Sequence, residues 1–293
     1  MEYQTRSLRE NDREMILEIA RKTWSGNDHL PHMFEDWMSN PDCHTVAVIQ
    51  SEKVAALGCV RVIDDGHTGW LEGLRVHQDH QGKGLARIIT TSLKEKAIEL
   101  GVERIRLTAS MDSPIPNHLA QSISMRCLYS LHVKWLDEFE RVKAIRSTSM
   151  MREISIDEFL RYGIEVDSLI PYGVVIYHWY AFDITNPPIK EINQLEDLRF
   201  WLAKSQLNEI EGVAMGFQMM NDSGSEWCTT IYPNSLGALL SLLSKQGEHC
   251  LQYNIQDMML LYPIEFSMNP DLMDILNESM GYGLTLNLYE GNL

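Results

Sequence analysis

A glycine-rich turn between a strand and a long helix constrains this 293-residue sequence more than any other feature. Residues 68–76 have the pattern of a strand, Gln81-Gly82-Lys83-Gly84 follows, and apolar residues then recur at helical spacing from Leu85 to Leu100. Glycines allow the backbone to approach an anion closely, and the first N–H groups of a helix have no partner within the helix. The segment therefore predicts a binding site for a phosphate-bearing ligand.

The turn differs from two common nucleotide-binding motifs. It lacks the Gly-x-x-x-x-Gly-Lys-Ser/Thr of a Walker loop and the Gly-x-Gly-x-x-Gly of dinucleotide-binding folds. A helix start that uses two glycines and binds no ligand would explain the same residues, so this alternative stays open from the turn alone.

Further strands and helices are predicted around this turn. Strands are expected over residues 44–50, 54–63, 104–109 and 133–136. Helices are expected after Asn11 or Asp12, over residues 31–38, and after a proline-broken loop at residues 113–116 through Leu128-Tyr129. Such an alternation predicts an α/β (α+β) fold for this part of the chain.

The net charge of −16 is distributed unevenly along the sequence. Residues 1–150 contain 19 Lys and Arg against 21 Asp and Glu, whereas residues 151–293 contain six against 20. This change in composition indicates two domains, which we place at residues 1–145 and 150–293. Because so acidic a chain repels phosphate backbones and anionic lipid head groups, we expect neither nucleic acid nor a membrane as its partner.

The cysteines and the apolar segments bear on the compartment. Five widely spaced cysteines without a Cys-x-x-Cys pair argue against a disulfide framework, and no apolar run reaches the length of a membrane span. The N-terminus lacks the features of a signal peptide. We therefore predict a cytoplasmic protein. No metal site is expected, since the pair His29-x-x-His32 has no third ligand at a usable spacing.

The turn and its flanks resemble a known family. Gln81-x-x-Gly84-x-Ala86, which follows Leu74-Arg75-Val76, resembles the pyrophosphate loop of the GNAT N-acetyltransferases. The resemblance covers roughly residues 3–137 and implies a GNAT fold that binds acetyl-CoA. The cofactor-binding residues that it implies are Leu74, Arg75, Val76, Gln81, Gly82, Lys83, Gly84, Leu85 and Ala86.

Segments outside the loop suggest a narrower resemblance. Asp28-His29-Leu30-Pro31, Glu72-Gly73-Leu74-Arg75-Val76 and the later Leu169-Ile170-Pro171 resemble the animal histidine N-acetyltransferases. That family transfers acetyl from acetyl-CoA to the α-amine of free histidine. The resemblance implies L-histidine as the acceptor and places Asp28 and His29 where the substrate enters. An ordinary helix-capping role would also explain Asp28.

Acetyl transfer to an amine requires a neutral amine, a polarised thioester carbonyl and a protonated leaving thiolate. A free α-amine has a pKa near ~8, so a carboxylate helps at neutral pH. We predict Glu72 as this base and the backbone N–H of Val76 as the donor to the thioester oxygen. Tyr129 is the candidate acid, because GNAT members often place a tyrosine on the helix after the fourth strand. A salt-bridged carboxylate and a core tyrosine are the alternatives for Glu72 and Tyr129.

The second half of the sequence repeats the order of elements but not the phosphate loop. Strands over residues 213–220, 227–232, 251–255 and 284–289 and helices over residues 235–244 and 270–280 follow the order of the back half of a GNAT domain. The loop position holds Tyr232-Pro233-Asn234-Ser235-Leu236-Gly237, without a Gly-x-Gly turn. We interpret this half as a diverged GNAT-like domain that binds no cofactor. An unrelated α/β domain is the alternative.

Two other functions remain compatible with the sequence. The acetyl acceptor could be the N-terminus of a peptide or protein, which would need an open groove instead of a closed pocket. Alternatively, the chain could bind acyl-CoA without catalysis and act as a regulator, with the acidic half as its interaction surface. The sequence identifies no protein partner.

Overall fold

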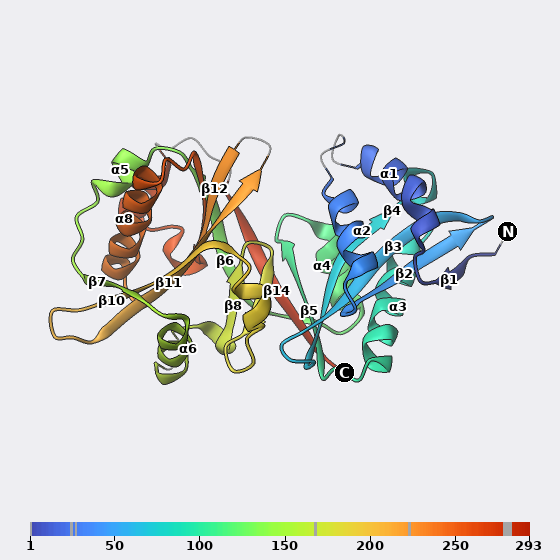
Figure 1. The fold of residues 1–293 in the computed structure, drawn as a ribbon, viewed down its shortest axis with the longest axis horizontal. Helices are drawn as coiled ribbons and strands as arrows, with labels where there is room; N and C mark the ends of the chain where they lie inside the picture. Colours follow the sequence, from blue (N-terminus) through green and yellow to red (C-terminus); the bar gives the residue numbers. More distant parts are fainter. Residues whose placement is uncertain (1, 24–25, 27, 167–168, 222–223, 278–282) are drawn as a thin grey trace. The chain divides into compact units, whose positions relative to one another are not determined.

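The computed structural model describes residues 2–23, 26, 28–166, 169–221, 224–277 and 283–293, and Figure 1 shows it as a ribbon. The chain divides into two compact units. Unit 1 comprises Met1–Ala109, Ser113–Cys127 and Tyr289–Leu293, and unit 2 comprises Ser110–Asp112 and Leu128–Leu288. No helix among the described residues is long and apolar enough to cross a membrane.

Unit 1 is a sheet with helices on both faces (Figure 1). Its strands lie in the order β1-β2-β3-β4-β5, followed by the end of β14. Strands β1 to β4 are antiparallel to their neighbours, whereas β4 and β5 are parallel, as the helical crossover α3 between them requires. The elements are β1 (Gln4–Arg6), η1 (Glu10–Asp12), α1 (Arg13–Arg21), α2 (Leu30–Ser39), β2 (Cys43–Gln50), β3 (Lys53–Ile63), β4 (Thr68–Val76), η3 (Gln78–His80), α3 (Leu85–Glu99), β5 (Arg104–Ser110), α4 (Pro114–Ser122) and β14 (Gly283–Asn292).

Alternating side chains of the central strands form two cores in unit 1. On β2, Val46 and Val48 pack in the core that contains α3, whereas Ala47 and Ile49 pack in the core that contains α1 and α2. Successive side chains of a strand point to opposite faces of the sheet. The sheet of unit 1 is therefore covered on both faces.

Strands β4 and β5 separate partway along their length. They pair only from Thr68 to Trp70, although β4 continues to Val76. On its other side, the register of β4 against β3 shifts between Leu57 and Cys59, opposite Gly73 with a φ of +66°. Such a β-bulge bends a strand and increases its twist, which accounts for the divergence of β4 from β5.

Unit 2 repeats this arrangement. Its strands lie in the order β7-β10-β11-β12-β13-β6, and the parallel pair β12 and β13 is again joined by a helix, α8. The helix packs in one core with the strands beneath it, around Trp227 and Leu242. The elements are β6 (Arg126–Leu136), α5 (Phe139–Lys143), β7 (Met150–Ile154), α6 (Ile156–Glu165), η4 (Pro171–Gly173), β8 (Val174–Tyr177), β9 (Tyr180–Asp183), α7 (Ile189–Ile192), β10 (Glu196–Lys204), β11 (Ile210–Asn221), β12 (Gly224–Pro233), α8 (Leu236–Gln252), β13 (Asp257–Pro263), η5 (Ile264–Phe266) and α9 (Pro270–Asn277).

The two units exchange the last strands of the two repeats. Strand β6 closes the first repeat in chain order, yet it pairs with β13 and most of it belongs to unit 2. The end of β14, the last strand of the second repeat, belongs to unit 1 beside β5. We retain residues 1–145 and 150–293 as the proposed domains in chain order, because each segment contains one copy of the repeat.

The predicted order of strands and helices is confirmed from β2 to β5, and two of the predicted elements are wrong. Leu128 and Tyr129 lie in strand β6 and not in a helix. The preceding helix begins at Pro114, inside the predicted loop, because proline fits the first turn of a helix. It ends at Ser122, and Ser124 has a φ of +69°, which helical backbone does not allow. The spacing of Ile123, Met125 and Leu128 is compatible with a helix, and the sequence has no glycine near Ser124 that would indicate a turn there.

The other wrong element is the strand predicted over residues 251–255. The helix α8 continues to Gln252, and Asn254 then turns the chain with a φ of +54°. Strand β13 begins only at Asp257. The helix predicted over residues 270–280 is present as Pro270–Asn277, and its last three residues lie outside the described part of the chain.

Candidate active site

The glycine-rich turn forms an open start for helix α3. Gly82 and Gly84 have φ values of +73° and +78°, so both adopt the left-handed conformation that favours glycine. A Cβ built on either glycine would meet no atom within 4 Å. In the described part of the chain, the backbone N–H groups of residues 82–86 make no hydrogen bond. This turn therefore presents backbone N–H groups that can donate hydrogen bonds to an anion such as a pyrophosphate.

The side chains of the turn contribute less than its backbone. Gln81 is exposed, and the Lys83 ammonium donates a hydrogen bond of 2.8 Å to the carbonyl of Asp79. Leu85 is buried in the core and anchors the first turn of α3. Ala86 follows it on the same helix. The structure thus brings the predicted residues 81–86 together in one turn.

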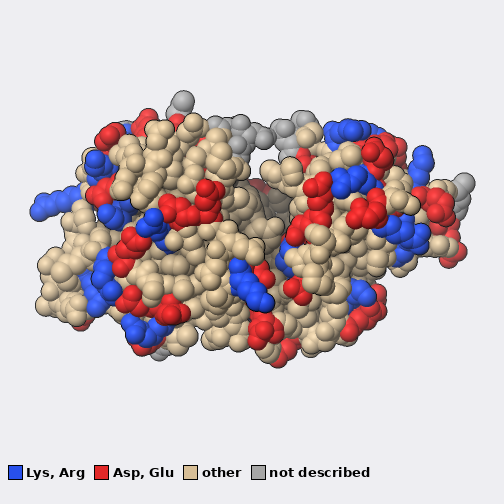
Figure 2. Space-filling view, in the orientation of Figure 1, with Lys and Arg blue, Asp and Glu red and all other residues tan. Residues whose placement is uncertain are grey.

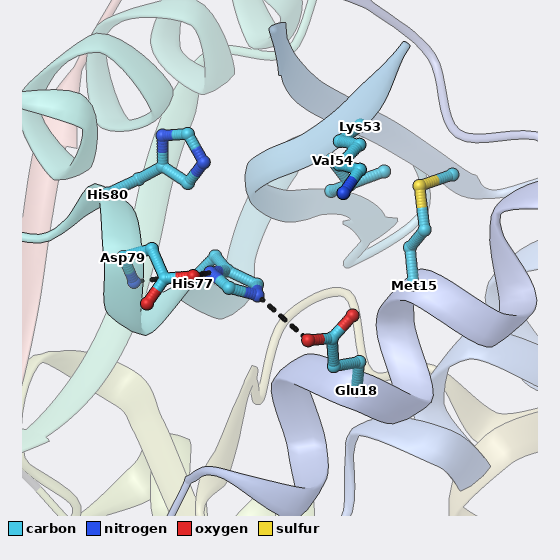
Figure 3. A pocket seen from close by; sticks show the side chains of 7 residues that line it. All are labelled: Met15, Glu18, Lys53, Val54, His77, Asp79 and His80. Carbon is cyan, nitrogen blue, oxygen red and sulfur yellow. Dashed lines mark hydrogen bonds and ion pairs between the residues drawn. The ribbon is translucent and has the colours of Figure 1, made fainter. Parts of the chain in front are cut away.

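A small cavity lies beside this turn (Figure 3). Its volume is about 130 Å³, and Figure 3 shows the His77 ring directed toward Glu18, 3.5 Å away. The cavity is lined by Met15, Glu18, Lys53, Val54, His77, Asp79 and His80. Its two carboxylates outnumber its one lysine, so the charge of the lining does not favour an anion. The exposed glycines, and not this cavity, are the better phosphate site.

Arg75 and Asp28 form a buried ion pair. Arg75 donates from Nε to Asp28 Oδ2 at 2.8 Å and from Nη2 to Oδ1 at 2.9 Å, and the Asp28 side chain is fully buried. Asp28 Oδ1 also accepts a hydrogen bond from the N–H of Leu30, the first residue of α2. The structure therefore joins a predicted cofactor residue to a predicted substrate residue, and it gives both of them a role in holding the start of α2.

The chain neighbours of this pair, His29, Leu74 and Val76, take no part in the hydrogen bonds that join its two side chains. His29 is exposed and caps α2, where its carbonyl accepts hydrogen bonds from the N–H groups of His32 and Met33. Leu74 and Val76 are partly buried against the core under α3. Their predicted contacts with substrate or cofactor stay predictions.

Glu72 is the central residue of the site. Its Oε1 accepts hydrogen bonds from Trp37 Nε1 at 2.7 Å and from Arg61 Nη2 at 2.8 Å. Its Oε2 is buried and has no hydrogen-bond partner among the described residues. Because the side chain is only 5% exposed, solvent does not readily replace that partner. A buried carboxylate oxygen without a partner is costly, so it marks a place where a ligand donor fits.

Arg61 holds Glu72 in a charged network. Its guanidinium also lies 2.6 Å from Asp36 Oδ2 on α2. Burial acts to lower the pKa of Arg61, but the charge of Glu72 and the hydrogen bonds that Arg61 donates to Glu72 and Asp36 outweigh it, and the pKa is raised. Arg61 therefore stays protonated and orients the Glu72 carboxylate, leaving one oxygen available.

Trp37, Arg61 and Gly73 are site residues that the sequence analysis did not assign. A Cβ on Gly73 would lie 2.3 Å from the Trp37 ring, so only glycine permits the ring to reach Glu72. A glycine inside a strand pattern is the signal that could have revealed this close approach. The partners Trp37 and Arg61 come from other elements, and nothing in the local pattern identifies them.

Tyr129 belongs to unit 2, whereas Glu72 belongs to unit 1. Its hydroxyl donates a hydrogen bond to the carbonyl of Val174 and lies 3.3 Å from the hydroxyl of Tyr232. Tyr232 in turn accepts a hydrogen bond from the N–H of Ile176. These contacts give Tyr129 a structural role in tying β6 to β8 and β12, and its role as the acid stays a prediction.

Comparison with known proteins identifies the family of the first part of the chain. Residues 13–121 match the family described as acetyltransferase (GNAT). This segment is a GNAT domain. The open turn before α3 and the separated strands β4 and β5 both lie within the matched residues.

Two curated relatives match the GNAT domain and its surroundings. Probable N-acetyltransferase 16 of Homo sapiens is 36% identical over 101 residues, which are 34% of this chain and 27% of that protein. Histidine N-acetyltransferase of Oreochromis niloticus is 35% identical over 80 residues, which are 27% of this chain and 24% of that protein. The chain thus spans about a quarter of the length of the curated relatives it matches.

Two solved structures show the same fold over nearly the whole chain. A GCN5-related N-acetyltransferase from Sphaerobacter thermophilus has a TM-score of 0.62 and 13% identity, covering 99% of this chain and 95% of that one. A tandem GNAT protein from the clavulanic acid biosynthesis pathway has a TM-score of 0.55 and 13% identity, covering 99% and 98%. The predicted GNAT fold is confirmed.

Proposed function

We propose that this chain is an acetyl-CoA-dependent N-acetyltransferase that acts on the α-amine of a free amino acid, with L-histidine as the leading acceptor. The observation that carries the proposal is the buried Oε2 of Glu72, which has no partner in the described part of the chain and lies on the strand that leads into the glycine turn. The names of several curated relatives support histidine as the acceptor. The cytoplasm as the compartment is part of the same proposal.

The chain would hold acetyl-CoA by its backbone. The N–H groups of residues 82–86 would bind the pyrophosphate, and Val76 at the end of β4 is the proposed donor to the thioester oxygen. Acetyl-CoA supplies an activated acyl group as a thioester. Lys83 adds positive charge near the phosphates, although its ammonium is engaged by the carbonyl of Asp79.

Glu72 would remove the proton of the attacking amine. Trp37 and Arg61 hold Oε1, so the carboxylate presents Oε2 to the substrate in a fixed orientation. The amine nitrogen forms a bond to the acetyl carbon, the carbon–sulfur bond breaks, and the departing thiolate takes up a proton. Tyr129 is the proposed donor of that proton.

The acidity of the protein supports a small substrate over a nucleic acid. On the face shown in Figure 2, the lysine and arginine side chains of each unit are interspersed with aspartate and glutamate and form no continuous basic surface among the described residues. A groove that follows a phosphate backbone needs such a surface. The absence of nucleic-acid and membrane partners stays a prediction.

A panel of acceptors tests the proposal. The purified full chain is incubated with acetyl-CoA and with L-histidine, other free amino acids, histidine amide, imidazole propionate, which lacks the amine, and a peptide that begins with histidine. Release of the CoA thiol is followed. We expect turnover with L-histidine and none with imidazole propionate. Preference for the peptide would support an acceptor at a chain terminus, and acetyl-CoA binding without turnover on any amine would support a regulator.

A further inference from the structure

Two cysteines lie beside the carboxylate of Glu72. The Sγ atoms of Cys43 and Cys59 and a carboxylate oxygen of Glu72 all lie within 4.8 Å of one another. They come from three neighbouring strands, β2, β3 and β4, and Cys59 lies directly opposite Glu72 in the register. Positions 43, 59 and 72 have no motif spacing, so only strand pairing brings these groups together.

The chemistry of this cluster suits a thiophilic divalent cation. Zinc and its analogue cadmium bind thiolate sulfur together with carboxylate oxygen, and zinc–sulfur bonds are about 2.3 Å long. Ligand atoms this close can surround one ion after small side-chain movements. The buried Glu72 Oε2, which has no hydrogen-bond partner among the described residues, is a ready third ligand.

Charge balance also favours such an ion. Glu72 and Arg61 already neutralise each other, and the thiols are uncharged when protonated. Replacing the two thiol protons with one divalent cation leaves the total charge of the cluster unchanged, since two thiolates balance two positive charges. A buried site therefore accepts the exchange without a new uncompensated charge.

We propose that Cys43, Cys59 and Glu72 form a binding site for Zn²⁺ or Cd²⁺. Given the proposed function, the bound ion blocks acetyl transfer, because it occupies the oxygen that would take the proton of the amine. Acetyl-CoA binding at the glycine turn remains intact, since no residue of that turn belongs to the cluster.

Proton release is the signature of this exchange. Burial, the neighbouring Cys43 thiol and the charge of Glu72 raise the pKa of Cys59, whereas Arg61 acts in the opposite direction. Asp36 is linked to the cluster by its ion pair with Arg61. Zinc and cadmium bind thiolates, so binding of one cation through both cysteines displaces two thiol protons. Affinity should increase as the pH rises, by up to about 100-fold per pH unit for two protons.

Cadmium titration of the full chain tests the site. The protein carries Cys127→Ser to remove its exposed thiol, is kept reduced with a phosphine, and is titrated with Cd²⁺ while thiolate-to-metal absorption is recorded. We expect one Cd²⁺ per chain and release of two protons in weak buffer. Cys43→Ser, at a half-buried position, should weaken binding at least about 10- to 100-fold. Cys228→Ala is the control, because it removes a buried strand thiol from unit 2, and affinity should not change.

The outcomes separate this site from the enzymatic proposal. Equal affinity in the Cys43→Ser protein, or no absorption change in the parent, would overturn the metal site whatever the activity. Binding that leaves turnover on L-histidine unaffected would overturn the inhibition. An inactive protein that still binds Cd²⁺ through Cys43 would refute the proposed function and leave the site standing.

Discussion

The helices α3 and α8 occupy the same place in the two repeats, but their N-termini are capped differently. Helix α3 begins after the left-handed Gly84, where added atoms would meet nothing. Helix α8 begins after Ser235, whose hydroxyl accepts a hydrogen bond from the N–H of Ala238. A Cβ on Gly237 would lie 2.8 Å from the hydroxyl of Thr148. One helix start is open to an anion, and the other is closed by side chains of its own unit.

The parallel strand pairs next to these helices also differ, because one pair separates and the other stays paired for longer. Strands β12 and β13 pair over five residues, from Glu226 to Thr230, whereas β4 and β5 pair only from Thr68 to Trp70. The register of β12 against β11 is continuous, and β4 carries the bulge at Gly73. The repeated fold alone does not make a site. A few local features decide which copy can admit a ligand, which supports our interpretation of the second copy as one that binds no cofactor.

The largest effect is expected from closing the open turn. Gly84→Val places a β-branched side chain at a φ of +78° and in the space proposed for the pyrophosphate, so acetyl-CoA binding should be lost. Gly66→Val is the matched control, since Gly66 has a φ of +88° and equally open surroundings in the turn between β3 and β4. Calorimetric titration measures both. Unchanged affinity in a folded Gly84→Val protein would refute the cofactor site.

A smaller effect is expected from neutralising the carboxylate. Glu72→Gln keeps the shape of the side chain and should preserve acetyl-CoA binding, while turnover falls by roughly 10²- to 10⁴-fold at neutral pH. The loss should diminish as the pH rises, because the amine then deprotonates without help. Initial rates over a pH series test this. A protein with full activity at pH 7 would assign Glu72 to a purely structural role with Arg61.

Two glycines that face tryptophan rings sharpen the comparison further. A Cβ at Gly73 would lie 2.3 Å from the Trp37 ring, and one at Gly216 would lie 2.4 Å from the Trp227 ring. Either alanine variant should lose about 1–3 kcal/mol of stability through overpacking. Only Gly73→Ala should also reduce turnover, because Trp37 donates to Glu72. Urea denaturation and steady-state rates distinguish the two, and equal loss of turnover in both would contradict the separation of site and scaffold.

The smallest effect is expected at the closed helix start. Ser235→Ala removes the hydrogen bond to the N–H of Ala238 and should lower the free energy of unfolding by about 1 kcal/mol. Acetyl-CoA should still bind with a stoichiometry of one per chain. A second bound molecule after this substitution would show that the cap alone keeps the second copy from binding the cofactor.

Much of the fold could be predicted from local pattern. Strand β4, the glycine turn and helix α3 lie where the sequence predicts them, because alternating burial, left-handed glycines and helical spacing are all local signals. The sequence wrongly predicts a helix at Tyr129, because the turn at Ser124 contains no glycine. The exchange of the strands β6 and β14 cannot be predicted from the local sequence either, since it depends on pairing between distant segments.

The candidate site also contains parts that the local sequence predicts and parts that depend on distant residues. The backbone donors at residues 82–86 follow from the motif, since their geometry is set by the turn itself. The pairing of Arg75 with Asp28, and of Arg61 with Glu72, joins residues from different elements. Side-chain partners of this kind are fixed by packing, so a motif names the charged residue but not the group that neutralises it.

The exchanged last strand has a consequence for synthesis of the protein. Unit 1 is completed by residues 289–293, and Glu290 is a partner of Arg106, which is only 2% exposed. While the ribosome is still translating the second repeat, the nascent first repeat has an unpaired edge at β5 and a guanidinium without that carboxylate. Unpaired strand edges recruit other chains. The domain that carries the proposed chemistry is therefore translated first but completed last, and in the interval its unpaired edge at β5 is a place where we expect a chaperone to act.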